Sequence, residues 1–154
     1  MSDRHRFRAE WHNYQEGVFF VTICAHAKKC LFGHIQDGNI HFSKIGKIIN
    51  ECISEIPNHH QDTKVWNYVI MPNHVHLLLQ INTDNAGRIM NTPTISTVIR
   101  LMKGAVTKQA GFPVWQKSFY DHVIRNDNDY LEIWNYIAGN PSKWANDKFY
   151  IPSR

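Results

Sequence analysis

The chain has 154 residues, a length that suits one domain spanning residues 1–154 around a single hydrophobic core. Hydrophobic residues make up 43% of it and charged residues 19%, which excludes an intrinsically disordered chain. Seventeen lysines and arginines against thirteen acidic residues give a net charge of +4 and a pI near 9.0. This charge is compatible with a polyanionic partner without requiring one.

Neither membrane insertion nor secretion is expected. The longest apolar runs, such as residues 18–21, are far too short to cross a bilayer. No apolar segment follows the first residues, as it would in a secretory signal. Cys24, Cys30 and Cys52 are odd in number and lack C-x-x-C spacing, so we expect reduced thiols in a cytoplasmic protein.

A strand and a hairpin open the predicted fold. Residues 17–25 are rich in β-branched and aromatic side chains, which is typical of a central strand. Residues 31–35 and 39–42 flank an Asp-Gly pair, and this pair is a strong hairpin signal.

A helix and two strands are expected next. Ser43 is the expected N-cap of a helix that runs through about Ile56, because isoleucines recur there at helical spacing. Pro57 is expected to end this helix. Residues 64–70 and 74–81 have the composition of strands, and the tight Met-Pro-Asn turn between them predicts that they pair.

The remaining elements alternate between helix and extended chain. Residues 82–93 are polar and rich in turn-forming residues, which indicates a loop, and residues 94–110 have the apolar spacing of a helix. Residues 114–124 are expected to be extended. A last helix is expected over about 126–140, where Pro141 closes it.

The order of these elements indicates an α+β protein. Strand, hairpin, helix, two strands, helix, strand and helix follow one another along the chain. We therefore expect a ferredoxin-like two-layer sandwich, in which helices pack on a mostly antiparallel sheet.

The most informative motif is the segment Met-Pro-Asn-His-Val-His at residues 71–76, which leads into three leucines. In a strand, alternate side chains share a face, so His74 and His76 project together. Two adjacent imidazoles on a rigid strand can form half of a divalent-metal site. The ordinary alternative is that two polar residues simply begin an edge strand. The pair also resembles the start of a histidine-triad nucleotide hydrolase motif, but Leu78 stands where that motif requires a third histidine.

A candidate nucleophile lies in the last predicted helix. Tyr136 and Asn140 are four residues apart, so they are expected on one helix face. A phenol near a metal that polarises a phosphoryl oxygen could attack a phosphodiester. Because Pro141 disfavours helical dihedrals at the residue before it, Asn140 is expected at the C-cap, where its side chain could turn away from Tyr136.

Two further tyrosines compete for the role of nucleophile. Tyr120 lies in the extended aromatic segment, where packing or base stacking is the commoner role. Tyr130 precedes Tyr136 by six residues, about 240° around the helix, and is therefore expected on the opposite side. His122 could contact the scissile phosphate or help to position the metal, although a structural role is the commoner one for a lone histidine.

Basic residues suggest where a nucleic acid could bind. Charges that hold phosphates, interleaved with rings that stack on bases, suit a nucleic-acid surface, although a solvated face explains the charges equally well. An N-terminal group lies beside Trp11 and Tyr14, a second lies on the helix over 94–110, and a lysine follows Trp115. The candidate DNA-binding residues are Arg4, Arg6, Arg8, Arg100, Lys103, Lys108 and Lys117.

Several short segments, taken together in order, are more specific than any one motif. They are residues 19–24, 30–33, 69–76, 103–108, 114–117, 121–126, 136–137 and 140–144. In this pattern the chain resembles the HUH single-tyrosine transposases of bacterial insertion sequences, and most closely their relatives, the REP-associated tyrosine transposases. The resemblance covers almost the whole chain.

This resemblance implies a metal-dependent endonuclease and strand transferase that acts on single-stranded DNA beside a hairpin. His74 and His76 match the metal-binding pair of the family, Tyr136 its nucleophile and Asn140 its polar third ligand. The implied cofactor is Mg²⁺ or Mn²⁺, and two histidines favour Mn²⁺. Cleavage would leave a 5′-phosphotyrosine link and a free 3′-OH.

The resemblance also bears on partners and leaves an alternative open. It implies a bacterial, nucleoid-associated protein with hairpin DNA as partner, no membrane, and either a monomer or a homodimer. The alternative function is that of a catalytically inactive, sequence-specific DNA-hairpin-binding protein.

Overall fold

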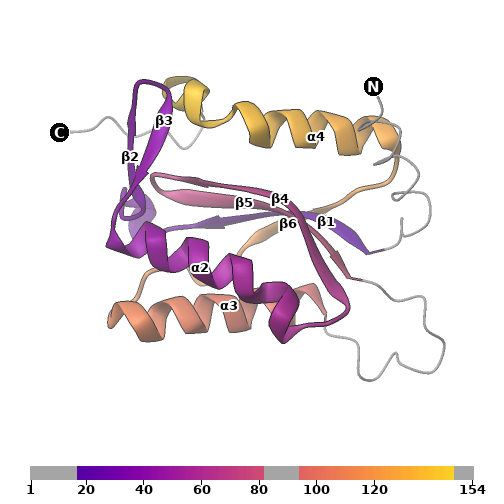
Figure 1. Ribbon diagram of the computed structural model, residues 1–154, viewed down its shortest axis with the longest axis horizontal. Coiled ribbons are helices and arrows are strands. Elements are labelled where there is room, and N and C mark those ends of the chain that lie inside the picture. Colours follow the sequence, from indigo (N-terminus) through magenta and orange to yellow (C-terminus); the bar gives the residue numbers. More distant parts are fainter. Residues whose placement is uncertain (1–16, 82–93, 148–154) are drawn as a thin grey trace.

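The computed structural model describes residues 17–81 and 94–147 (Figure 1). No helix in these two ranges is long and apolar enough to cross a membrane. The elements, in chain order, are β1 (Val18–Cys24), η1 (His26–Lys28), β2 (Gly33–Gln36), β3 (Asn39–Phe42), α2 (Lys44–His59), β4 (Thr63–Met71), β5 (His74–Ile81), α3 (Ile95–Ala110), β6 (Tyr120–Val123), α4 (Asp127–Gly139) and η2 (Pro141–Asn146).

Four strands form an antiparallel sheet in the order β4-β5-β1-β6, and β2 and β3 form a separate hairpin. The central strands β1 and β5 pair along their whole length, from Val18 opposite Gln80 to Cys24 opposite His74. Helix α2 connects β1 to β4 by way of the hairpin, and α3 connects β5 to β6. This connectivity and strand order confirm the predicted ferredoxin-like α+β fold.

The two faces of the sheet bury different clusters because side chains alternate along each strand. Helices α2 and α3 cover one face, over a core that includes Val21, Leu77 and Leu79. Helix α4 lies on the other face, over a cluster that includes Met71 and Leu78 (Figure 1). The predicted two-layer sandwich therefore comprises the sheet with α2 and α3, and α4 adds a third layer that the sequence did not indicate. His74, His76 and Leu78 alternate along β5, so the histidines face α4.

Helix α2 extends further than expected. Pro57 was predicted to end it, but the helix continues to His59 with Pro57 in its last turn. At that position the proline removes only one intrahelical hydrogen bond. The backbone N–H of His60 closes the helix end by donating to the carbonyl of Ile56 at 3.0 Å.

The segment expected to be extended over residues 114–124 contains only a short strand, β6. Its first residues turn into the core instead: Val114 is fully buried, and Trp115 packs against Phe32 with ring centroids 5.2 Å apart. A single bridge to Ala25 holds this part beside the end of β1. Backbone pairing at this bridge and the burial of Val114 and Trp115 together hold the segment in place.

Candidate functional site

The two histidines lie at the start of β5, directly after the turn that contains Pro72. Both are buried, with exposed fractions of 0% for His74 and 2% for His76. Their ring centroids are 4.7 Å apart. Because β5 is hydrogen-bonded to strands on both sides, the backbone under the pair is held firmly. The predicted arrangement of two imidazoles on one face is present.

Each imidazole is oriented by a hydrogen bond at its Nδ1 atom. The side-chain oxygen of Asn73 lies 2.9 Å from Nδ1 of His74, and the amide nitrogen of Asn73 donates to the carbonyl of Lys28 at 3.1 Å. The oxygen of Asn73 can only accept, so Nδ1 of His74 donates to it, and Nε2 is the ring atom that faces Asp147. The hydroxyl of Thr22 lies 2.9 Å from Nδ1 of His76. Such contacts orient metal-binding histidines in known metal sites.

A carboxylate that sequence reasoning missed completes a potential donor set. Asp147 follows η2, and its Oδ2 atom lies 3.5 Å from Nε2 of His74. One ligand atom each from His74, His76 and Asp147 can be chosen so that all lie within 4.8 Å of one another. Two imidazole nitrogens and a carboxylate oxygen are suitable donors for Mn²⁺ and similar divalent cations. No sequence signal marked Asp147, because it lies far along the chain from the histidines and outside any regular pattern.

Tyr136 lies next to the histidine pair. Its ring centroid is 5.3 Å from that of His76, and it meets the ring of Phe20 edge-on at 6.2 Å. Phe20 in turn stacks on His76 at 5.1 Å. Tyr136 is 43% exposed, so its phenol is held by aromatic contacts while remaining accessible to a substrate.

Asn140 lies at the C-cap of α4, as expected, but its backbone differs from the prediction. Its φ of −64° and ψ of −44° are helical despite the proline that follows. The helical turn is retained because η2 begins at once with Pro141, and the N–H of Lys143 donates to the Asn140 carbonyl at 3.0 Å. The Asn140 side chain is buried on the same side of the chain as Tyr136.

A cavity of about 300 Å³ joins these groups. It brings the phenol, the amide and the carboxylate to one surface, together with a lysine that sequence reasoning did not single out. The residues that line it are Tyr136, Asn140, Lys143, Asn146 and Asp147.

The surroundings of Tyr136 favour its protonated form. Burial raises the pKa of the phenol above its ordinary value, and the negative charge of Asp147 raises it further. The Asn140 side chain acts in the opposite direction by hydrogen bonding, which lowers the pKa of the phenol. Without a nearby cation, the phenol is therefore protonated at neutral pH.

The competing tyrosines lie elsewhere. Tyr130 is 3% exposed and packs between Trp66 and Trp134, at 6.1 Å and 6.0 Å between ring centroids, so it is buried in the cluster under α4 and not open to a substrate. Tyr120 is exposed on β6. Close to it, Nε2 of His122 lies 2.9 Å from Oδ2 of Asp129.

Those predicted DNA-binding residues that the structure describes are not gathered at this cavity. Arg100, Lys103 and Lys108 lie on α3, which packs on the opposite face of the sheet. The ammonium group of Lys103 donates to the carbonyls of Gln116 and Lys117 at 2.8 Å and 3.2 Å, and burial lowers its pKa. Lys103 therefore holds the loop that carries Lys117. The arginines at positions 4, 6 and 8, with Trp11 and Tyr14, lie outside the described residues.

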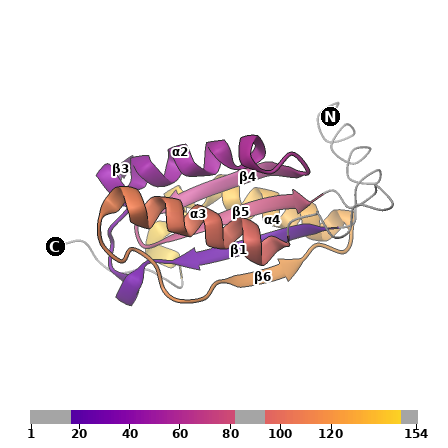
Figure 2. The same cartoon turned by 90° about the horizontal axis from the view of Figure 1, so that it is seen from below.

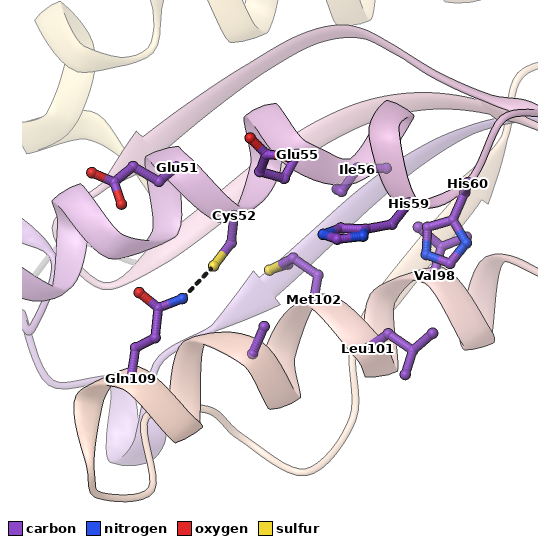
Figure 3. Close-up of a pocket in the computed structure, with 11 residues that line it drawn as sticks. Glu51, Cys52, Glu55, Ile56, His59, His60, Val98, Leu101, Met102 and Gln109 are labelled. Carbon is purple, nitrogen blue, oxygen red and sulfur yellow. Dashed lines mark hydrogen bonds between the residues drawn. The ribbon is translucent and has the colours of Figure 1, made fainter.

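A larger cavity, of about 570 Å³, lies between α2 and α3 (Figure 3). The amide of Gln109 donates to the sulfur of Cys52 at 3.5 Å across it. Among the described residues, His74, His76 and Asp147 form the group of metal-ligating side chains that lie close together, so this second cavity is not the candidate metal centre. Its lining residues are Glu51, Cys52, Glu55, Ile56, His59, His60, Val98, Leu101, Met102, Ala105 and Gln109.

Comparison with known proteins places the chain in a family. The family model described as IS200-like transposase matches residues 13–140. The chain belongs to the IS200-like transposase family. This confirms the resemblance seen in the sequence.

Two proteins of Haemophilus influenzae are similar to this transposase-family chain. An uncharacterized protein is 34% identical over 169 aligned residues, which cover 96% of the chain and 93% of that relative. A protein named as a candidate REP-associated tyrosine transposase is 37% identical over 82 residues, which cover 48% of the chain and 47% of that relative.

Solved structures share the fold. A REP-associated tyrosine transposase bound to a REP hairpin matches with a TM-score of 0.64 at 22% identity, over 82% of this chain and 67% of that one. A candidate transposase from Deinococcus radiodurans R1 matches with a TM-score of 0.51 at 14% identity, over 79% and 88% of the two chains. These likenesses support the ferredoxin-like architecture described above.

Proposed function

We propose that this member of the IS200-like transposase family cleaves and rejoins single-stranded DNA beside a hairpin, with Tyr136 as the nucleophile. One observation carries the proposal: the phenol of Tyr136 lies against His76, over a cavity that it shares with Asn140 and Asp147. A nucleophile next to a set of metal donors is an arrangement that supports metal-assisted phosphodiester cleavage.

His74, His76 and Asp147 would hold Mg²⁺ or Mn²⁺, and Asn140 would supply a further oxygen donor. When bound, the cation polarises a phosphoryl oxygen and stabilises the charge that develops on it. Asn73 and Thr22 keep the two imidazoles in place through their Nδ1 atoms. The fit is chemical: nitrogen and oxygen donors converge, and because Nδ1 of His74 is engaged by Asn73, its Nε2 is the atom that would coordinate the cation.

In the proposed reaction the oxygen of Tyr136 attacks the phosphorus atom of one phosphodiester. The new tyrosine O–P bond forms as the bond from phosphorus to the 3′ oxygen breaks, and the phenol proton ends on that 3′ oxygen. The products are a 5′-phosphotyrosine and a free 3′-OH. Attack by another 3′-OH reverses the step and reseals the strand, so no nucleotide cofactor is consumed.

Hairpin DNA is the proposed partner, and the solved relative described as bound to a REP hairpin supports this choice. Tyr136, the two histidines, Asn140 and Asp147 all come from one chain, so the proposed reaction does not require a second copy. Light scattering with and without hairpin DNA would show whether a homodimer forms.

A labelling experiment tests the proposal. The protein is incubated with Mn²⁺ and a pool of DNA hairpins that carry randomised single-stranded flanks, and the products are separated on a denaturing gel. DNA labelled at its 3′ end should give a labelled protein adduct, because the downstream fragment stays on the tyrosine. DNA labelled at its 5′ end should instead give a shortened free strand.

The control is Tyr136→Phe, which should bind the hairpins but form no adduct. Hairpin binding without any adduct from the wild-type protein would contradict the proposal and favour the inactive hairpin-binding alternative. An adduct that survives in Tyr136→Phe would show that another tyrosine is the nucleophile.

A further inference from the structure

The edge strand β6 exposes its side chains beside the candidate site. It pairs antiparallel with β1, so that Tyr120 lies opposite Thr22 and His122 lies opposite Phe20. Directly opposite residues of two strands point to the same face, so Tyr120 and His122 share the face of Thr22 and Phe20. Since Thr22 and Phe20 both contact His76, Tyr120 is one strand away from the side chains that position this candidate metal ligand.

Tyr120 is poorly covered for an aromatic residue. It is 62% exposed, and within the described ranges no side-chain hydrogen bond or ring contact holds it. Helix α4 buries Met71 and Leu78 on the same face, whereas β6 lies at the edge of the sheet and all four of its residues are exposed (Figure 2). The ring therefore contributes little to the core and is open to a ligand.

We propose that Tyr120 is a stacking residue that supports a base of the single-stranded DNA next to the reacting phosphate. The inference rests on the proposed function and adds to it a residue that positions the substrate. Aromatic rings that bind single-stranded DNA are exposed, lie beside the path of the backbone and accept any base, since every base has a π-face. Tyr120 is exposed and lies on the sheet face that Tyr136 packs against, so a strand whose phosphate reaches Tyr136 can present a base to it.

The hydrogen bond between His122 and Asp129 fixes the strand that carries this ring. It joins β6 to the first turn of α4, where Asn126 caps the helix by accepting from the N–H of Asp129 at 2.8 Å. The backbone N–H of Ile124 donates to the carbonyl of Val18 at 2.9 Å and continues the pairing with β1. β6 is thereby held both to the sheet and to the helix of the nucleophile.

Two fluorescein-labelled probes test the inference by anisotropy: an oligothymidine of about 20 nucleotides and an abasic sugar-phosphate strand of the same length. Tyr120→Ala should weaken binding of oligothymidine by roughly 5- to 150-fold, the range reported for loss of a stacked base. It should leave binding of the abasic strand unchanged, because that strand has no base to stack. Tyr120→Phe should retain the wild-type affinity for both.

Phe112→Ala is the matched control, since Phe112 is an aromatic residue, 42% exposed, in the loop after α3. It should change neither affinity. Equal affinity of Tyr120→Ala and wild type for oligothymidine would overturn the inference, and so would an equal loss on both probes, which indicates a folding or backbone effect. If the wild-type protein binds neither probe and forms no adduct in the labelling experiment, both the proposed function and the inference about Tyr120 are wrong.

Discussion

Asn73 fixes the orientation of His74 through both ends of its amide. Its nitrogen is engaged by the carbonyl of Lys28, so its oxygen must face the imidazole, and the proton of His74 is thereby placed on Nδ1. The hydroxyl of Thr22 can donate or accept, so it orients His76 without selecting one tautomer. The turn residue before the first histidine thus supports the site as directly as a residue inside it does.

The phenol of Tyr136 should titrate above its ordinary pKa of about 10, because burial and the charge of Asp147 both favour the protonated form. Asp147→Asn should lower this pKa by removing the charge. The measurement is the tyrosinate absorbance of each protein minus that of the same protein carrying Tyr136→Phe, in the absence of metal.

The control for this titration is Glu51→Gln on the exposed side of α2. It removes one negative charge on the opposite face of the sheet from the site. The pKa of Tyr136 should not move in this variant. A downward shift as large as that of Asp147→Asn would show that net charge, rather than Asp147, raises the pKa.

At the scale of single residues, the sequence predicted those site residues whose relative position follows from the local geometry of a strand or a helix. His74 and His76 share a face because strands alternate, and Tyr136 and Asn140 share one because helices repeat every four residues or so. Asp147 could not be found in this way. Its place in the site depends on how η2 packs Trp144 beside His74, with ring centroids 6.2 Å apart, and this is a tertiary contact.

At the scale of elements, the close approach of α2 to the loop before β2 explains an otherwise unfavourable glycine. A Cβ atom at Gly46 would overlap the carbonyl oxygen of Phe32, and Ser43 at the N-cap donates to the carbonyl of Leu31 at 2.6 Å. The first turn of α2 is therefore anchored on this loop, and only glycine leaves room for it.

Two glycine substitutions should consequently have opposite effects on stability. Gly46→Ala should lower the free energy of unfolding by about 1–3 kcal/mol, because the added methyl group overpacks the contact with Phe32. Gly104→Ala, in the middle of α3 with open space around it, should raise this free energy by about 1 kcal/mol through helix propensity. Urea denaturation of both variants and the wild type measures the two changes. Stabilisation by Gly46→Ala would mean that the loop moves away from α2 at little cost.

The elements that were predicted wrongly share a cause. The end of α2 and the path of residues 114–119 depend on contacts that local propensity does not include. Pro57 is tolerated because it falls in the last turn, and before β6 the extended segment pairs with the chain after β1 only at a bridge, where the core buries Val114 and Trp115. Strand and helix periodicity predicted where most elements lie, and tertiary burial decided where they end.

At the scale of the whole molecule, the site is assembled from segments that are far apart in the sequence. The histidines belong to a central strand, whereas Tyr136, Asn140 and Asp147 come from the last helix and the segment after it. The order of strands and helices was enough to predict the sheet. The position of α4 on the histidine face was not, because an amphipathic helix does not specify which face it covers.

A divalent cation should therefore stabilise the molecule by linking β5 to the segment after η2. At a concentration of Mn²⁺ about 100 times its dissociation constant, binding adds about 2.7 kcal/mol to the free energy of unfolding. This corresponds to a rise in Tm of about 5–10 °C for a chain of this size. Mg²⁺ should give a smaller rise at the same concentration, because two imidazoles are poor ligands for it. Calorimetry with each metal, and again after a chelator is added, measures these shifts.

Two comparisons show whether the shift arises at this site. Asp147→Ala and His76→Ala should each reduce it, whereas His59→Ala, which lies in the cavity between α2 and α3, should leave it intact. The shift should also fall at acidic pH, because the histidines must be neutral to bind metal. An undiminished shift at acidic pH, or in Asp147→Ala and His76→Ala, would place the bound metal elsewhere on the molecule. A shift that disappears in those two variants alone would tie metal binding to the contact between the central strand and the C-terminal segment, on which the proposed reaction depends.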